Sequence, residues 1–127
     1  DGGTADLVIK PGAGNTTVQS GGIALLHGAN VKLGESGQSS SLDVIGGSGL
    51  GIISDGELTV EGGNGGYTFV RSNSGNLAIS TVGNVTVTGG TAGGFAHVLG
   101  NPLWPAAIGP DTCPNLVSSS STPSLFT

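Results

Sequence analysis

The stretch NLAISTVGNVTVTGGTAGG, residues 76–94, decides how this chain folds. It contains two short runs in which apolar residues alternate with small or polar ones, and glycine follows each run. Alternation with a period of two is typical of a half-buried β-strand, and glycine is typical of a turn. The stretch therefore predicts two strands and two turns, and no residue in it suggests chemical reactivity.

The same apolar pattern occurs twice more upstream, at a spacing of 27 residues. A fifth column drifts, with separations of 26, 26 and 28 residues, and the difference falls in turns rich in Gly, Ser and Asn. An internal repeat of this length indicates a solenoid or a related repeat architecture. The columns are Ile23, Leu50 and Leu77; Leu25, Ile52 and Ile79; Val31, Leu58 and Val85; Leu33, Val60 and Val87; and Val18, Val44, Val70 and Val98.

Each repeat holds three strands and three turns, which we call one rung. Hairpins between successive strands would break the apolar columns, whereas pairing each strand with its equivalent one repeat later preserves them. We therefore predict an all-β fold, a short single-domain parallel β-helix of three to four rungs over residues 1–100. The stack is expected to be roughly 15–20 Å tall, because neighbouring strands lie about 4.8 Å apart.

Residues 6–100 resemble the parallel β-helix repeats of secreted adhesins, autotransporter passengers and viral or phage fibre proteins, in rung length and strand alternation. A stack this short exposes a large fraction of its end rungs, whose backbone N–H and C=O groups are expected to need a cap or another subunit. An incomplete β-sandwich completed by a donated strand, from the TADLVIK start or the PSLFT end, is the competing fold. The regular columns argue against it, because a sandwich has no reason to repeat its core at a fixed interval.

The composition changes at residue 101, and the last 27 residues hold five of the six prolines, the only Trp and the only Cys. Proline removes backbone donors, so we expect residues 101–127 to form an irregular tail and no further rung. The tail is predicted to cap its own last rung or to dock as an arm on the next subunit. Its candidate intersubunit contacts are Leu103, Trp104, Ile108, Leu116, Val117, Leu125 and Phe126. Cys113 is a candidate for an intermolecular disulfide, a free thiol or a small apolar residue.

Charge and composition exclude several classes of function. The formal net charge is −5 with only three basic residues, so the chain offers no basic face to nucleic acid. No apolar run approaches the roughly 20 residues that a membrane span needs. The chain begins at Asp1 and contains no Met, which favours a processed, secreted protein outside the cell or on a cell or virion surface. Two sequons make Asn15 and Asn84 glycosylation candidates.

The carboxylates do not predict a catalytic pair. Asp55, Glu57 and Glu61 form the only cluster, and alternation places Glu57 and Glu61 on the outside of one strand. Their Cα atoms would lie roughly 13 Å apart, farther than the about 5–10 Å between the carboxyls of glycosidases. We expect a solvated acidic edge and no catalytic residues. Arg71, the only Arg, is expected at a strand end over a turn, with binding of an acidic sugar as the alternative.

Metal, cofactor and ice-binding sites are not predicted either. The near matches to a calcium-binding repeat place Gly51 and Tyr67 where that repeat needs Asp. A loose cation contact at Asp55 or Glu57 stays open. His27 and His97 lack Cys or Asp at ligand spacing, so we expect surface or rung-edge side chains. The outward column Lys32, Thr59, Thr86 is broken by a charge, which argues against a regular ice-binding face.

The sequence favours a non-enzymatic structural subunit of an extracellular fibre or surface appendage that assembles end to end with copies of itself. The alternative is a glycan-binding adhesin or viral-fibre module that uses outward Thr and Asn side chains with Tyr67 and Phe69. A polysaccharide-active β-helix enzyme ranks third. Expected partners are the chain itself and a covalent or bound glycan.

Overall fold

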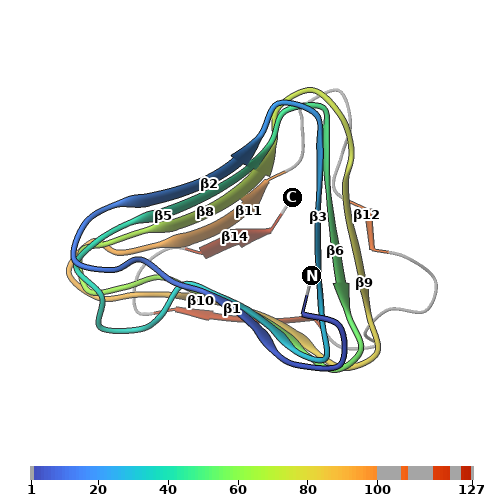
Figure 1. Cartoon of the computed structure of the whole chain (residues 1–127). Coiled ribbons are helices and arrows are strands. Elements are labelled where there is room, and N and C mark those ends of the chain that lie inside the picture. The colour runs from blue at the N-terminus through green and yellow to red at the C-terminus, as the bar shows by residue number, and fades with distance from the viewer. Residues whose placement is uncertain (1, 100–106, 109–115, 121–123, 127) are drawn as a thin grey trace.

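The computed structural model describes residues 2–99 together with the backbone of residues 107–108, 116–120 and 124–126. Its strands lie in three parallel sheets, and these residues contain no helix. Figure 1 looks along the axis of the stack, so the three sheets appear as the sides of a triangle. The all-β parallel β-helix is confirmed, with three strands in each rung and about four rungs.

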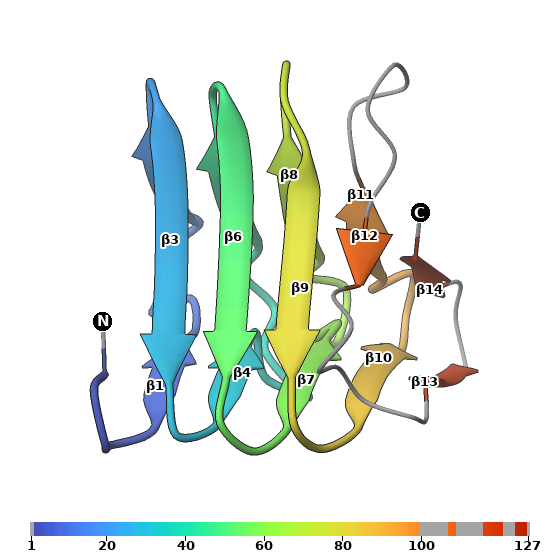
Figure 2. The same cartoon turned by 90° about the vertical axis from the view of Figure 1, so that its right-hand side faces the viewer.

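Each strand pairs in parallel with the equivalent strand of the next rung, as Figure 2 shows from the side. Sheet A contains β1 (Leu7–Ile9), β4 (Val31–Leu33), β7 (Leu58–Glu61), β10 (Val85–Gly89) and β13 (Leu116–Ser120). Sheet B contains β2 (Thr16–Ser20), β5 (Leu42–Gly46), β8 (Thr68–Ser72), β11 (Ala96–Leu99) and β14 (Ser124–Phe126). Sheet C contains β3 (Ile23–Gly28), β6 (Gly49–Ser54), β9 (Leu77–Thr81) and β12 (Ala107–Ile108).

The core lies inside the triangle and consists of the inward side chains of all three sheets. In the middle rungs these side chains are almost fully removed from water: Ile52, Leu58 and Val60 are each 0 % exposed. Burial of a side chain of this size contributes about 1.5–3 kcal/mol. The stack is therefore stabilised mainly by apolar contact between equivalent residues of neighbouring rungs.

Buried hydroxyl groups hold the corners where one sheet gives way to the next. Ser54 and Thr81 occupy the same register position in successive rungs, and each donates to a carbonyl two or three residues ahead, at Glu57 (2.7 Å) and Gly83 (2.6 Å). Thr68 closes another corner by donating to the Glu61 carbonyl at 2.7 Å. Gly34 lies beside this bond with φ +80°, and a Cβ there would collide with the same carbonyl and hydroxyl.

Three of the five predicted apolar columns are confirmed throughout residues 2–99. Val31, Leu58 and Val85 are register partners, as are Leu33, Val60 and Val87 in sheet A, and Val18, Val44, Val70 and Val98 in sheet B.

The two columns predicted for sheet C are wrong at their first residue. Ile23 pairs with Gly49 and Leu25 pairs with Gly51, because the first interval in this sheet is 26 residues and not 27. A shift of one residue moves every side chain of a strand to the opposite face. Ile23 and Leu25 are accordingly 77 % and 57 % exposed, and Leu26, at 8 %, is buried instead.

The predicted tail contains three of the strands. β12, β13 and β14 pair with β9, β10 and β11, so the expectation that residues 101–127 add no strand to the stack is wrong at these positions. Ile108, Leu116, Val117, Leu125 and Phe126 lie on these strands. Leu103, Trp104 and Cys113 lie outside the described residues, so their predicted contacts stay predictions.

The corrected register predicts different costs for two adjacent truncations. Leu26→Ala should lower the free energy of unfolding by about 2–4 kcal/mol, because it removes buried methyl groups and leaves a cavity. Leu25→Ala should cost less than about 1 kcal/mol, because its side chain is mostly in water. Urea unfolding of both variants at low protein concentration measures the difference. Equal costs would contradict the register.

Candidate functional site

The outer face of sheet B carries a cluster of rings that we call the aromatic row. It consists of Tyr67, Phe69, Phe95 and His97, which come from β8, β11 and the residues directly before these strands. Phe69 and His97 are register partners on neighbouring rungs. All four side chains are half-buried. The row therefore covers part of a sheet whose other face borders the core.

The rings contact one another across the rungs. Tyr67 and Phe95 are stacked, with centroids 5.1 Å apart and ring planes 9° from parallel. His97 lies 4.6 Å from Phe95 and 5.5 Å from Phe69 in tilted arrangements. Aromatic pairs of this geometry stabilise neighbouring strands by about 0.5–1.5 kcal/mol each. Because Tyr67 and Phe95 are stacked, each ring covers one face of the other.

Two charged residues, Asp43 and Arg71, flank the aromatic row. The Tyr67 hydroxyl donates a hydrogen bond to Asp43 at 3.0 Å, and the Arg71 guanidinium carbon lies 5.4 Å from the centroid of Phe69. Arg71 is one residue before the end of β8 and packs on this ring, whereas we expected it over a turn. Its buried Nε has no hydrogen-bond partner within the described part of the chain.

The environment of Tyr67 raises its pKa. The largest cause is the hydrogen bond to Asp43, followed by burial of the phenol and the negative charge of Asp43; the positive charge of Arg71 opposes the shift. The phenol therefore keeps its proton to higher pH and stays a hydrogen-bond donor to the carboxylate.

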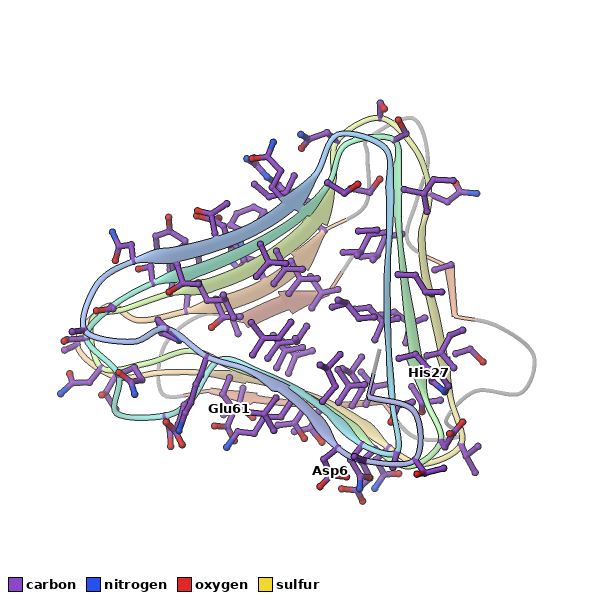
Figure 3. All side chains as sticks on the ribbon, viewed as in Figure 1. Asp6, His27 and Glu61 are labelled. Carbon is purple, nitrogen blue, oxygen red and sulfur yellow. The ribbon has the colours of Figure 1, made fainter. Side chains whose placement is uncertain are left out.

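The outer side of sheet A carries mixed charges. Lys10 pairs with Glu35 at 3.1 Å, and Lys32 pairs with Glu61 at 3.5 Å. The pKa of Glu35 is lowered, chiefly by its hydrogen bond with Lys10. Figure 3 shows Asp6 and Glu61 directed away from the core at opposite ends of this sheet. Exposed pairs of this kind contribute little to stability and keep the face solvated.

The predicted acidic cluster is divided among different partners. Asp55 lies 3.4 Å from His27, and Glu61 accepts from the Ser36 backbone N–H at 3.0 Å as well as pairing with Lys32. Glu57 is exposed, and its backbone N–H donates to the side chain of Asn30. Within the described residues, no three His, Cys, Asp or Glu side chains come close enough together to hold a metal ion.

The two sequons have different surroundings. Asn15 is exposed, and its side-chain oxygen accepts from the Ser41 backbone N–H at 2.9 Å. Asn84 is half-buried directly before β10. Glycosylation at either residue stays a prediction, and the more exposed Asn15 offers the easier access.

The rung that contains β1, β2 and β3 leaves one end of the stack open. These three strands are the last members of their sheets at that end, as Figure 2 shows. The inward side chains of Leu7, Ile9, Val18 and Ala24 are only partly buried there. Gly2 donates a backbone hydrogen bond to the His27 carbonyl and so covers part of β3, whereas the backbone bonds at Ile9, Thr16 and Ser20 join β1 and β2 to the next rung. Within the described part of the chain, this open end combines strand edges at β1 and β2 that lack a neighbouring strand with apolar side chains that are only partly buried.

Comparison of the chain with protein-family models, curated proteins and solved structures found no match. The part of the chain that the structure describes also contains no helix of the length and hydropathy needed to cross a bilayer. The β-solenoid fold is shown by the strand pairing alone. No match supports kinship with adhesins, autotransporters or fibre proteins.

Replacement of Asp43 should change the titration of Tyr67, which is the only Tyr in the chain. Asp43→Asn should lower the Tyr67 pKa, because it removes the carboxylate that accepts the hydrogen bond of the phenol and whose negative charge disfavours tyrosinate. Asp55→Asn, which alters a carboxylate paired with His27, is the control and should leave it unchanged. Ultraviolet absorbance of tyrosinate follows both titrations.

The same shift has a consequence for stability. Folding raises the Tyr67 pKa, so the protonated phenol stabilises the folded state. This contribution to the free energy of unfolding is fully present below the pKa of an unfolded tyrosine, and it is lost as pH rises through the pKa of the folded state. Asp43→Asn should therefore weaken the alkaline loss of stability. An unchanged Tyr67 titration in this variant would contradict the role of the hydrogen bond.

Proposed function

We propose that this protein is a non-enzymatic structural subunit that assembles end to end with copies of itself into an extracellular fibre or surface appendage. The observation that carries the proposal is the open end of the stack. There the strands β1 and β2 lack a neighbour on one side within the described residues, and Leu7, Ile9 and Val18 are only partly buried.

Addition of a strand to this end would pair its backbone groups and cover its partly buried apolar side chains. In a parallel sheet, alternate residues direct their N–H and C=O groups to opposite sides of the strand. Thr16 bonds toward β5 through its N–H and Ser20 through its C=O, so Thr17 and Gln19 direct theirs to the open side. A strand from another copy, placed about 4.8 Å away, would pair these groups and cover the inward apolar residues.

The other end of the same chain offers matching geometry. β12, β13 and β14 continue the three sheets in parallel with the preceding rung, so a second copy placed on them would extend the stack without a change of strand direction. A contact between two different ends of identical chains is heterologous, and repetition of a heterologous contact produces a filament.

Gln19→Pro should block this assembly while leaving the rung intact. Proline removes a backbone donor on the open side of β2 and is tolerated on an edge strand. Negative-stain microscopy and sedimentation of the full chain at low and high concentration should show filaments for the native protein and for the control Gln19→Thr, but not for Gln19→Pro. Native protein that stays monomeric at high concentration would remove the fibre proposal.

A second candidate function is glycan binding on the outer face of sheet B, and the aromatic row with Arg71 favours it. Aromatic rings bind the apolar faces of sugars, and Arg forms paired hydrogen bonds with carboxylates. The Arg71 guanidinium carbon lies 5.4 Å from the centroid of the Phe69 ring on this face, and the buried Nε has no hydrogen-bond partner within the described residues. The glycan class that fits is an acidic one, with a uronic or similar acid.

This candidate predicts two losses of affinity. Phe69→Ala and Arg71→Gln should each weaken binding of a uronic-acid oligosaccharide at least about tenfold, which corresponds to about 1.4 kcal/mol. Thr59→Ala on sheet A is the control and should bind as the native protein does. Calorimetric titration measures the three affinities. Equal affinity of all variants, or no binding by the native chain, would exclude glycan binding at this face.

A further inference from the structure

Within residues 2–99, the outer face of sheet C is largely apolar, and His27 is the only acidic or basic residue among the outward positions of its strands. We call the outward residues of β3, β6 and β9 the C face: Ile23, Leu25 and His27 on β3, Gly49, Gly51 and Ile53 on β6, and Ala78 and Ser80 on β9. Ile23, Leu25 and Ile53 are 77 %, 57 % and 37 % exposed. Apolar side chains grouped in this way on a soluble domain are typical of an interaction surface.

The C face has a ridge beside a trough. Ile23 and Leu25 form the ridge on β3, and their register partners on β6 are Gly49 and Gly51, which have no side chains. Two shallow grooves of about 340 and 290 Å³ follow the glycines and continue to Ala78 on β9. Figure 2 shows the three strands lying side by side and nearly straight, so the ridge and the trough run in parallel.

Charge makes this face the natural place for two copies to meet. The six carboxylates within residues 2–99 lie on strands of sheets A and B or in turns: Asp6, Glu35, Asp43, Asp55, Glu57 and Glu61. Because the formal net charge is −5, contacts through those surfaces bring like charges together. Contact through the C face avoids most of this repulsion, because of these six carboxylates only Asp55, 3.4 Å from His27, lies at its edge.

We propose that the C face pairs with the C face of a second copy about a two-fold axis, with the ridge of each copy in the trough of the other. A two-fold contact uses the same surface on both partners, so that surface must be complementary to itself. A ridge and a trough side by side on one face meet this condition, because a half-turn about an axis parallel to the strands, midway between the two sheets, places the ridge of each copy opposite the trough of the other. The two sheets would lie about 10 Å apart, as stacked sheets do.

The size of the C face sets the strength of the pair. Three strands about 4.8 Å apart and about 20 Å long cover on the order of 300 Å² in projection, less than the about 800 Å² per partner of a stable complex. A single pair is therefore weak and forms at high protein concentration. The pair does not rest on end-to-end assembly, since it joins chains side by side and leaves the open end free.

Sedimentation equilibrium of the full chain in the Gln19→Pro background isolates the side-by-side contact. The mass should rise with concentration toward two chains and no further. Leu25→Thr should weaken this association at least about tenfold, because threonine keeps the strand but removes the ridge. Val8→Thr removes an apolar residue that is 52 % exposed on sheet A, so it is the matched control and should dimerise normally.

Gly51→Ala distinguishes a specific contact between complementary surfaces from non-specific hydrophobic association. A Cβ at Gly51 would lie 3.1 Å from Leu25 Cδ1 and would fill the trough. The proposed pair is then weakened, although the face becomes more apolar, whereas non-specific association would strengthen. A Gln19→Pro chain that stays monomeric would overturn the proposal, and this outcome includes the case that another segment or protein covers the C face. Dimerisation that is unchanged in Leu25→Thr or in Gly51→Ala would also overturn it.

Discussion

The whole structure depends on the stacking of like on like between neighbouring rungs. Val44 lies between Val18 and Val70, and Val60 lies between Leu33 and Val87, so each buried side chain contacts its equivalents above and below. Backbone bonds between parallel strands hold the same register. No local segment could bury its apolar residues alone, because one rung exposes both of its sides. The fold is thus a property of the repeat and not of any single strand.

The repeat made most of the fold predictable from sequence, because inward positions recur with alternating polarity. The prediction failed where the amino acids were ambiguous. In IALLHG, residues 23–28, four apolar residues stand in a row, so alternation alone cannot distinguish Leu25 from Leu26 as the inward residue. The glycines opposite them, Gly49 and Gly51, were the available signal, since a glycine is a poor candidate for a core column. The strands in the Pro-rich segment have few apolar residues in a clear pattern, and their pairing depends on the rung before them.

The candidate sites were less predictable, because they depend on contacts between side chains one rung apart. Tyr67 and Phe69 were recognised as outward residues, but their arrangement with Phe95, His97 and Arg71 follows from loop lengths that differ between rungs. Asp55, Glu57 and Glu61 are close in sequence, but strand β7 separates Glu61 from the other two. The three sheets consequently present three chemically different exteriors: mixed charges on A, rings on B and bare aliphatic groups on C.

The buried hydroxyls at the corners have a consequence for how such a chain can change in length. The bonds from Ser54 to Glu57 and from Thr81 to Gly83 each close a turn within its own repeat, and no residue of another repeat takes part in them. A duplicated segment of one period would therefore carry its own bends with it and would meet the same aliphatic columns on both sides. Elongation by gene duplication is then a local event, and unequal copying of one period would lengthen the rod without redesign of its remaining turns.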